Sequence, residues 1–338
     1  MPLTLEDIAR MADVSRSTVS RVINGDENVN EETRKKVEAV IRRLNFQPNI
    51  AARSLAAGRT GIVGLVIPAG VPALFTDPYF PQLIQGVTTT CNANDYSVML
   101  WLAEPTHERR TIRQILHGGL LDGVIVSSML VDDPIVLALY ESSKPFVLVG
   151  RHPSMDVNYV DVDNIHGGRE ATLHLLRLGR QRVGTITGPQ NMIAGRDRYQ
   201  GYCEAMQSFG RPLSETLVAE GDFTEMGGYL GMRELLPHKP DAVFVATDTM
   251  AAGALRALRE SGLHVPEDVA IVGFDDMPAA SQFIPPLTTI RQLTGQLGSS
   301  AMETLLDVIR KPEPPTRHLV LPTELVVRTS CGSLQGGD

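Results

Sequence analysis

Four polar side chains near the amino terminus have the types and spacing needed to bind DNA. Arg16, Ser17, Ser20 and Arg21 fall on one side of a helical pattern in SRSTVSRVIN, and the apolar residues of that pattern fall on the other side. A guanidinium group donates two parallel hydrogen bonds to a guanine edge, whereas a serine hydroxyl is permissive. This chemistry requires the helix to lie in a DNA groove, so the neighbouring elements must hold it there.

The first 24 residues predict two short helices with a tight turn between them. Thr4 and Asp7 are spaced as a capping box, which commonly begins a helix. Asp13 tolerates the backbone angles of a tight turn, and Ser15 is placed to cap the second helix. The apolar residues expected to face inward are Leu5, Ile8, Ala9, Ala12, Val19, Val22 and Ile23. Two helices with this spacing form the helix-turn-helix arrangement that enters a major groove.

A third helix is predicted after Asn30, a capping residue followed by two glutamates in the first turn. Its apolar residues, which recur at helical spacing, are Val37, Val40, Ile41 and Leu44. The three helices together predict a small all-α domain. From the pattern alone, an ordinary helical bundle with solvated charges is the alternative, because any amphipathic helix has a polar outer face.

Charge is distributed unevenly along the 338 residues, whose formal net charge is -8. Residues 1–60 carry ten Lys and Arg against eight Asp and Glu, and the remainder carries 21 against 31. DNA affinity depends on the charge near the phosphates and not on the charge of the whole chain. The relatively basic amino-terminal end is therefore compatible with DNA binding, and we expect the acidic remainder to limit indiscriminate binding.

From Gly61 onwards, short apolar strands alternate with helical stretches. The clearest strands are IVGLVI, YSVMLWL, DGVIVSS, PFVLVG, YVDVD, RVGTIT, DAVFVAT and DVAIVGF. This alternation is typical of parallel sheets covered by helices. The sequence alone leaves open whether the strands form one doubly wound sheet or two.

Sequence patterns of enzymes, secreted proteins and membrane proteins are absent. No glycine-rich phosphate loop of the right spacing follows a strand, no nucleophile elbow is present, and the eight histidines lack metal-ligand spacing. We therefore expect no enzyme activity, no cofactor and no metal. Cys91, Cys203 and Cys331 form no paired motif, no signal peptide precedes the first helix, and no apolar run reaches membrane-spanning length. These features predict a cytoplasmic protein.

The string TLEDIARMADVSRSTVSRVIN, then VNEETRKKVEAVIRRLNFQPN and AARSLA, resembles the head of the LacI/GalR family of transcription regulators without a gap over residues 4–56. One departure is Asp13, because the family usually has Gly in that turn. The segments GYCEAMQSFG, DFTEMGGY, FVATDTMAAGALRAL and VPEDVAIVGFDDMPAASQFIPPLTTIRQ resemble the effector domain of the family, which is similar to periplasmic sugar-binding proteins. The resemblance implies a small all-α helix-turn-helix domain followed by an α/β domain of two lobes with parallel sheets and three crossovers.

The resemblance also implies domain boundaries. We expect the helix-turn-helix domain at 1–46, a hinge helix and linker at 47–60, the effector-binding and dimerisation domain at 61–330, and a tail at 331–338. Within the large domain, one lobe would comprise 61–162 and 294–321, and the other 163–293 and 322–330. Because ligands bind outside the carboxyl ends of the strands in open parallel sheets, the effector is expected between the lobes.

Four residues match family positions that hold the effector. Arg198 matches an arginine that binds hydroxyls or carboxylates through its planar fork, and Asp275 matches a carboxylate that accepts from hydroxyls. Phe223 matches an aromatic position that packs on the ligand, and Asp248 matches an acidic residue at a strand end. Thr247 stands where Asn is common in sugar-binding members, which leaves the effector open. Without the resemblance, these residues are also compatible with an ion pair, helix caps and core packing.

The stretch QPNIAARSLAAGRTG resembles the family hinge helix, in which Leu55 would wedge between bases at the operator centre. Eight residues are too few for a stable isolated helix, so we expect it to form with DNA and a second hinge. The residues expected to contact DNA are Thr4, Ser15, Arg16, Ser17, Thr18, Ser20, Arg21, Asn24, Asn49, Ala52 and Leu55. Among them, Arg16, Ser17 and Arg21 would read base edges.

Taken together, these features imply a homodimeric repressor that binds a pseudo-palindromic operator in double-stranded DNA and is controlled by a small molecule, a sugar or sugar derivative. No heptad pattern follows Arg328, which favours a dimer over a coiled-coil tetramer. The alternative is a cytosolic carbohydrate-binding or processing protein without operator-specific DNA binding. The effector, the operator sequence and the direction of the ligand effect are left open.

Overall fold

The computed structural model describes residues 3–23, 25–26, 28–46, 59–67, 71–102, 108–127, 130–311 and 315–333. The chain divides into two compact units, Met1–Gly61 and Ile62–Asp338. No helix in these described ranges is long and apolar enough to cross a membrane.

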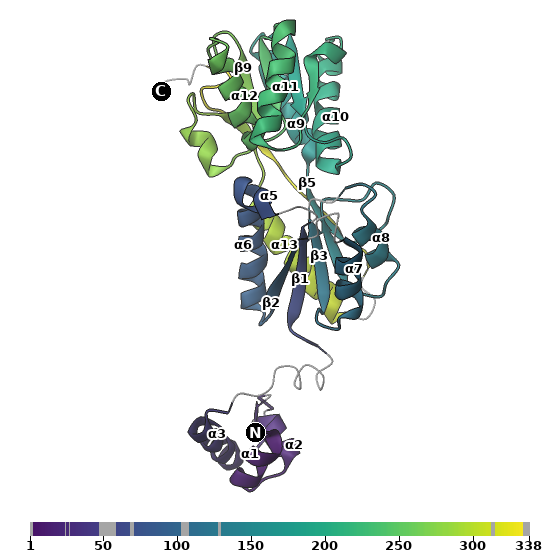
Figure 1. The fold of residues 1–338 in the computed structure, drawn as a ribbon, viewed down its shortest axis with the longest axis vertical. Coiled ribbons are helices and arrows are strands. Elements are labelled where there is room, and N and C mark those ends of the chain that lie inside the picture. The colour runs from purple at the N-terminus through teal and green to yellow at the C-terminus, as the bar shows by residue number, and fades with distance from the viewer. Residues whose placement is uncertain are drawn as a thin grey trace. The chain divides into compact units, whose positions relative to one another are not determined.

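The described residues of the first unit form three helices, α1 (Leu5–Ala12), α2 (Arg16–Ile23) and α3 (Glu31–Leu44) (Figure 1). A capping box begins α1, because the Thr4 hydroxyl accepts from the Asp7 N–H and the Asp7 carboxylate accepts from the Thr4 N–H. Asp13 ends α1 in the left-handed conformation at φ 52°. The Ser15 hydroxyl accepts from the Thr18 N–H at the start of α2. The predicted caps and turn are confirmed.

The core of the first unit forms where the helical patterns predict it. Its buried residues are Ile8, Ala9, Ala12, Val19, Val22, Val37, Val40 and Phe46. Phe46 was absent from the expected core: it follows Asn45, whose left-handed conformation ends α3, and its N–H bonds to the Ile41 carbonyl. With these residues inside, Arg16, Ser17 and Arg21 remain on the exposed side of α2.

The second unit contains two sheets, each with six strands in its described residues. The first sheet has the order β11 (His318–Leu321), β5 (Tyr159–Val162), β4 (Phe146–Val149), β3 (Gly123–Ser127), β1 (Ile62–Ile67), β2 (Ser97–Leu102). The second has the order β12 (Glu324–Val326), β10 (Thr288–Arg291), β9 (Ala270–Asp275), β8 (Ala242–Val245), β6 (Val183–Thr187), β7 (Val218–Glu220). We call the parts of the unit built on these sheets the first and second lobe.

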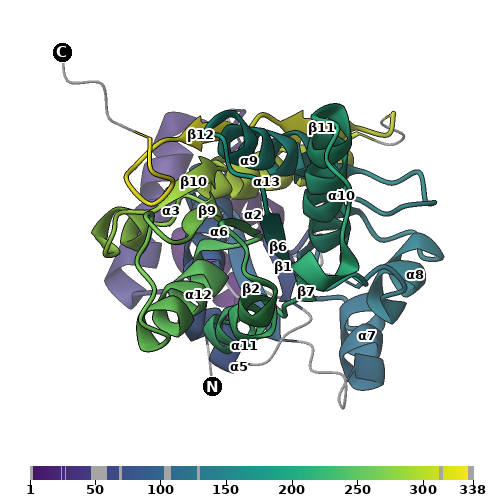
Figure 2. The ribbon, with the colours of Figure 1, turned by 90° about the horizontal axis from the view of Figure 1, so that it is seen from above.

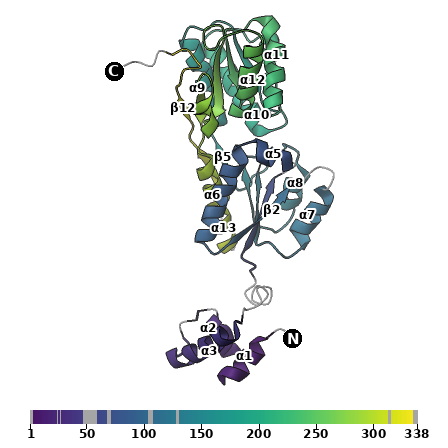
Figure 3. The ribbon, with the colours of Figure 1, turned by 60° about the vertical axis from the view of Figure 1, so that its left-hand side comes forward.

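Helices cover both faces of each sheet. In the first lobe, α6 (Tyr79–Ala93) and α13 (Thr294–Arg310) pack on one face, and α7 (Glu108–His117) and α8 (Pro134–Tyr140) on the other (Figure 3). In the second lobe, α9 (Asn164–Arg177) and α10 (Ile193–Ser208) face α11 (Glu225–Leu235) and α12 (Asp248–Glu260) across the sheet (Figure 2). The short elements are α5 (Val71–Thr76), η2 (Glu215–Leu217), η3 (Leu236–His238) and η4 (Pro278–Gln282).

The chain passes between the lobes three times: from β5 to α9, from β10 to α13, and from β11 to β12. The structure therefore resolves the open question in favour of two sheets with three crossovers. The strand pairs are parallel apart from β12, which runs antiparallel to β10. Because of the crossovers, several segments distant in sequence meet where the lobes adjoin.

Candidate functional site

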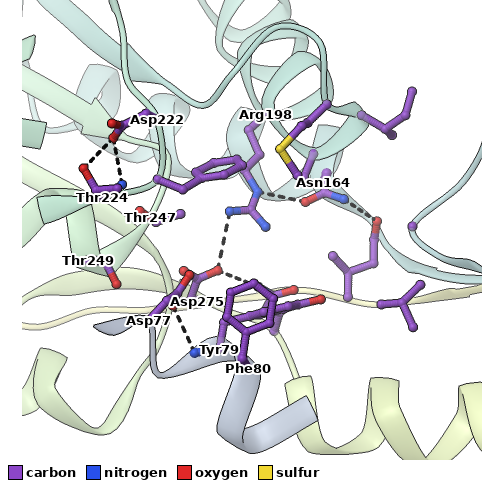
Figure 4. Close-up of a pocket in the computed structure, with 18 of the residues that line it drawn as sticks. Asp77, Tyr79, Phe80, Asn164, Arg198, Asp222, Thr224, Thr247, Thr249 and Asp275 are labelled. Atoms are coloured by element: carbon purple, nitrogen blue, oxygen red, sulfur yellow. Dashed lines mark hydrogen bonds and ion pairs between the residues drawn. The ribbon is translucent and has the colours of Figure 1, made fainter. Parts of the chain in front are cut away.

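A cavity of about 520 Å³ lies between the lobes, at the carboxyl ends of the strands of both sheets. Residues that follow β4, β5, β8, β9 and β10 line it, as do α5, α6 and α10. Figure 4 shows Arg198 and Asn164 facing Tyr79 and Phe80 across this space. The cavity is within the size range of small-molecule sites in proteins.

Arg198, on α10, is buried at the centre of the polar part of the cavity. Its Nε donates to Asn164 Oδ1 at 2.9 Å, and its Nη1 donates to the Ala246 carbonyl at 2.7 Å. Its Nη1 also lies 3.4 Å from Asp275 Oδ1, and the guanidinium carbon lies 3.7 Å from the centre of the Phe274 ring. The orientation of the planar fork is therefore fixed by acceptors on three different elements.

Asp275 ends β9 beside Arg198, and its backbone has φ 118°. Gln292, just after β10, donates to Asp275 Oδ1 at 2.5 Å. Burial raises the pKa of Asp275 to about 7; Arg198 opposes this rise, and the carboxylate of Asp77 adds to it. Asp275 is thus a buried acceptor whose charge is balanced by one arginine and opposed by a second acid.

Asp77 and Tyr79 reach the cavity from the first lobe. Asp77 accepts from the Tyr79 N–H at 3.0 Å, and burial raises the pKa of its carboxyl group. Burial also raises the pKa of Tyr79. The polar part of the cavity therefore receives oxygen-bearing side chains from both lobes, and hydroxyl-bearing ligands are bound by such groups.

A connected series of polar side chains crosses from one lobe to the other beside the cavity. Arg151, which follows β4, pairs with both carboxylate oxygens of Asp197 on α10 and lies 3.1 Å from Asp161 Oδ2. The Asn164 amide donates to Asp161 Oδ1 at 3.1 Å and its oxygen accepts from Arg198. Burial raises the pKa of Asp161, and Arg151 opposes that rise.

The rest of the wall is largely apolar. Phe223, in a left-handed conformation at φ 66°, lines the cavity with its ring 6.0 Å from the Arg198 guanidinium carbon. A non-glycine residue with an aromatic ring rarely adopts this backbone conformation. The other apolar side chains of this part are Leu130, Val131, Met192, Ile193, Ala194 and Met226. They offer a surface for the apolar face of a ligand.

Asp248 lies outside the set of described residues that line the cavity. Its two carboxylate oxygens accept from the Thr289 hydroxyl at 2.6 Å and from the Met277 N–H at 2.7 Å. Burial raises the pKa of Asp248 well above its ordinary value, and Asp275 adds to the rise. The structure therefore does not place this residue with Arg198, Phe223 and Asp275 on the cavity wall; its neighbours Thr247 and Thr249 lie there instead.

The residues expected to contact DNA lie partly inside the described ranges. Arg16 and Arg21 each have an acidic neighbour, with Arg16 Nε 3.0 Å from Glu6 Oε1 and Arg21 Nε 3.8 Å from Asp26 Oδ2. Exposed pairs of this kind are weak in water, so a phosphate or base can replace the acid. Ser15, Ser17 and Thr18 form a hydroxyl cluster at the start of α2. Asn24, Asn49, Ala52 and Leu55 lie outside the described residues.

Several cavity residues were missed from the sequence. They are Asp77, Tyr79, Arg151, Asp161, Asn164, Asp222, Thr249 and Gln292. Four of them, Arg151, Asn164, Asp222 and Gln292, lie within two residues beyond the carboxyl end of a strand, which is where ligands of open parallel sheets bind. Reading the residue after every predicted strand would have identified Arg151 and Asn164.

These two units define a class of protein: a helix-turn-helix head joined in one chain to a body of two lobes with a ligand-sized cavity. Residues 4–49 match bacterial regulatory proteins of the lacI family, and residues 172–331 match a periplasmic binding protein-like domain. The chain therefore belongs to the lacI family, and it is a DNA-binding transcriptional regulator.

Full-length relatives agree with that assignment. The HTH-type transcriptional regulator CelR of Thermobifida fusca is 43% identical over 332 residues, which cover 97% of this chain and 98% of that protein. The ribose operon repressor of Escherichia coli strain K12 is 36% identical over 334 residues, with 97% and 99% covered.

Solved structures show the same architecture. A CelR–cellobiose complex has a TM-score of 0.78 at 41% identity and covers 97% of this chain and 99% of that one. A lac repressor dimer bound to operator and the anti-inducer ONPF has a TM-score of 0.86 at 29% identity, with 98% and 99% covered.

Proposed function

We propose that this regulator is a repressor whose operator affinity is controlled by a small carbohydrate bound between the lobes. The observation that carries the proposal is the arrangement around Arg198, a buried guanidinium fork beside the carboxylate of Asp275 and the amide of Gln292. Such groups donate to and accept from hydroxyls, and the adjacent apolar wall matches the ring face of a sugar. CelR has been solved with cellobiose, and a second relative is a ribose operon repressor.

Within this proposal, the cavity residues have distinct roles. Arg198 and Asp275 bind ligand hydroxyls, and Phe223 packs on the apolar face of the sugar ring. Asp77 accepts from the same ligand across the lobe boundary. Asp248 acts indirectly, because its bonds hold Met277, which follows Asp275 in the chain, and Thr289, on the strand β10 that pairs with β9.

For the DNA-binding half, we propose a homodimer on a pseudo-palindromic operator. Arg16, Ser17 and Arg21 would read bases from α2, because their side chains are on its exposed side. Residues 47–60 would act as the hinge that joins the head at 1–46 to the two-lobed domain at 61–330. A ligand that changes the orientation of the two lobes would thereby change operator affinity.

An in vitro selection from random duplex DNA tests the DNA-binding half. We expect the full chain to enrich a sequence with twofold symmetry and to bind it with a steep salt dependence, because phosphate contacts release counterions. Replacing Arg16 by Ala should relax the preference at one base pair of each half-site, whereas uniform weakening across sequences would assign Arg16 to a phosphate. Failure to enrich any symmetric site would reject the proposed homodimer on a pseudo-palindromic operator.

Fluorescence anisotropy on the selected operator tests the effector half. We expect one sugar of a panel of mono- and disaccharides to change operator affinity in the wild type and not in Arg198→Ala. Arg196→Ala is the matched control, since Arg196 is an exposed arginine on the same helix that donates to the Gln190 carbonyl. An unchanged sugar response in Arg198→Ala would place the effector site elsewhere.

The same sugar should be recovered intact, because we propose that the cavity binds its ligand without catalysis. Chromatography of the sugar after prolonged incubation with the protein measures this directly. Conversion that is lost in Arg198→Ala would show that the cavity is an active site.

A further inference from the structure

The charges in the cavity are arranged so that its two arginines are already neutralised by the protein. The described residues that line the cavity include five carboxyl-bearing side chains, those of Asp77, Asp161, Asp222, Glu225 and Asp275. The same set includes two cationic side chains, those of Arg151 and Arg198. Carboxyl groups therefore outnumber cations among the described residues of the cavity wall.

Arg151 is held by two buried carboxylates. Its guanidinium makes a two-bond pair with Asp197, with Nη2 2.8 Å from Oδ1, and a further bond to Asp161. Asp161 and Asp197 are 5% and 4% exposed. These two acids offset the charge of the Arg151 guanidinium and so lower its attraction for a ligand anion.

The guanidinium of Arg198 also faces acceptors of the protein itself. Asp275 faces its Nη1, the Ala246 carbonyl accepts from the same atom, and Asn164 accepts from its Nε. The partner acid Asp275 is itself close to Asp77, whose charge raises the pKa of Asp275 in addition to the larger effect of burial. Above about pH 7, where Asp275 is ionised, an anion placed between these acids would be repelled by both.

We propose that the cavity selects uncharged polyhydroxyl ligands over phosphorylated or acidic sugars, and that Arg151 sets this selectivity because Asp197 keeps it from accepting a ligand anion. The inference rests on the proposed carbohydrate effector and narrows its chemical class. A neutral sugar donates its hydroxyls to the carboxylates and accepts from the amide of Gln292. A phosphate or carboxylate has no such donors to offer.

Matched pairs of ligands provide the test on the full-length wild-type protein. Calorimetric titration at about pH 8, where Asp275 is ionised, would compare cellobiose with cellobionate, glucose with glucose 6-phosphate, and ribose with ribose 5-phosphate. For the pair whose neutral member binds, we expect the anionic member to bind at least about 100-fold more weakly, because like charges are brought together in a buried site. An anion that binds as tightly as its neutral counterpart overturns the inference and leaves the proposed effector function intact.

Asp197→Asn then tests the role of Arg151. The amide retains the shape of Asp197 and removes one of the two charges that neutralise Arg151. We expect the affinity of the anion relative to the neutral sugar to rise about tenfold, since one unit of repulsion at close range is removed. If Asp197→Asn leaves this relative affinity unchanged, Arg151 does not set the selectivity.

Asp276→Asn is the matched control. Asp276 also has a largely covered side chain with two arginine partners, Arg291 and Arg328, neither of which is among the described residues that line the cavity. In Asp276→Asn, we expect the affinity of the anion relative to the neutral sugar to stay at the wild-type value. An equal rise in both variants would assign the selectivity to long-range charge and overturn the role of Arg151. Binding of none of the six ligands, together with no sugar response on the operator, would instead reject the effector proposal itself.

Discussion

Asp275 holds its carboxyl group in a position that ordinary aspartates avoid. Its backbone is in the positive-φ region, its side chain is buried, and Arg198 and Gln292 both contact the same oxygen. Burial raises its pKa to about 7 from the ordinary 3.8. The folded state therefore keeps the Asp275 proton up to about pH 7, whereas the unfolded chain releases it near pH 4.

Asp275→Asn should change how stability depends on pH. Between about pH 4 and pH 7 the folded wild type binds more protons at this site than the unfolded chain, so this contribution to the free energy of unfolding is largest below pH 4 and is lost as pH rises. Relative to the variant, the wild type should lose about 2 to 3 kcal/mol between pH 5 and pH 8. Urea unfolding at several pH values measures the difference.

The control for this experiment is Asp307→Asn, which changes an exposed carboxylate on α13 that pairs with Arg317. We expect its difference from the wild type to stay nearly constant over the same pH range. A wild-type minus Asp275→Asn difference that is flat, or that rises with pH, would contradict the raised pKa of Asp275.

The sequence predicted those cavity residues that stand in motifs resembling the family. Arg198, Phe223 and Asp275 stand in recognisable motifs, and the structure places all three on the cavity wall. Arg151 stands in no motif, because it reaches the cavity only through the fold and has its partners Asp161 and Asp197 on other elements. Asp248 stands in a motif as well, but its bonds to Thr289 and Met277, which are distant in sequence, decide where its carboxylate lies.

Three pairs of helices in the body are packed through glycine on both members. A Cβ at Gly168 of α9 would overlap the Arg198 carbonyl of α10, and one at Gly201 of α10 would overlap the Ile165 carbonyl of α9. The same reciprocal arrangement joins α11 to α12 through Gly228 and Gly253. Gly86 and Gly298 join α6 to α13 in the same way. Backbones this close leave no room for a side chain, so these glycines fix the distance between the helices.

Gly201→Ala should separate α9 from α10 and so disturb Arg198, whose Nε partner Asn164 begins α9. We expect a loss of about 1 to 3 kcal/mol in the free energy of unfolding, the usual cost of overpacking, and weaker sugar binding. Denaturant unfolding and calorimetric titration would measure the two effects. Gly295→Ala is the control, because a Cβ at that helical glycine lies 3.9 Å from its nearest neighbour, the Gln82 carbonyl oxygen.

For Gly295→Ala we expect a change of less than about 1 kcal/mol, with a gain favoured by the helix propensity of alanine. Wild-type stability in Gly201→Ala would show that the helices are free to adjust, and would remove close packing as the means by which Arg198 is positioned.

Element prediction succeeded where a strand is a continuous, mostly buried apolar run, including the four-residue strands β4, β5 and β8. The eight clearest apolar runs correspond to β1 to β6, β8 and β9. The remaining strands, β7, β10, β11 and β12, are as short, and β7, β11 and β12 are buried at one position at most. Their assignment depends on pairing with strands far away in the chain, and local periodicity does not contain that information.

The two lobes are joined around the cavity by contacts in addition to the three crossovers. The Val131 N–H donates to the Asn191 carbonyl at 2.8 Å, and Gln82 Nε2 lies 3.0 Å from the Met277 sulfur. Arg151 adds its pair with Asp197. Because a ligand between the lobes would contact both, its binding energy should oppose their separation and hence the unfolding of the whole second unit.

Differential scanning calorimetry of the full chain tests whether this stabilisation is confined to one unit. The first unit has its own buried core, so we expect it to unfold in a transition separate from that of the second unit. A sugar at about 100 times its dissociation constant should stabilise the second unit by about 2.7 kcal/mol, which raises its midpoint by roughly 5 °C or more. In the absence of DNA, the transition of the first unit should stay in place. Arg198→Ala should abolish the shift while retaining both transitions. A single transition that the sugar displaces as a whole would contradict this expectation, because it would show that the head and the body unfold as one cooperative unit even without an operator.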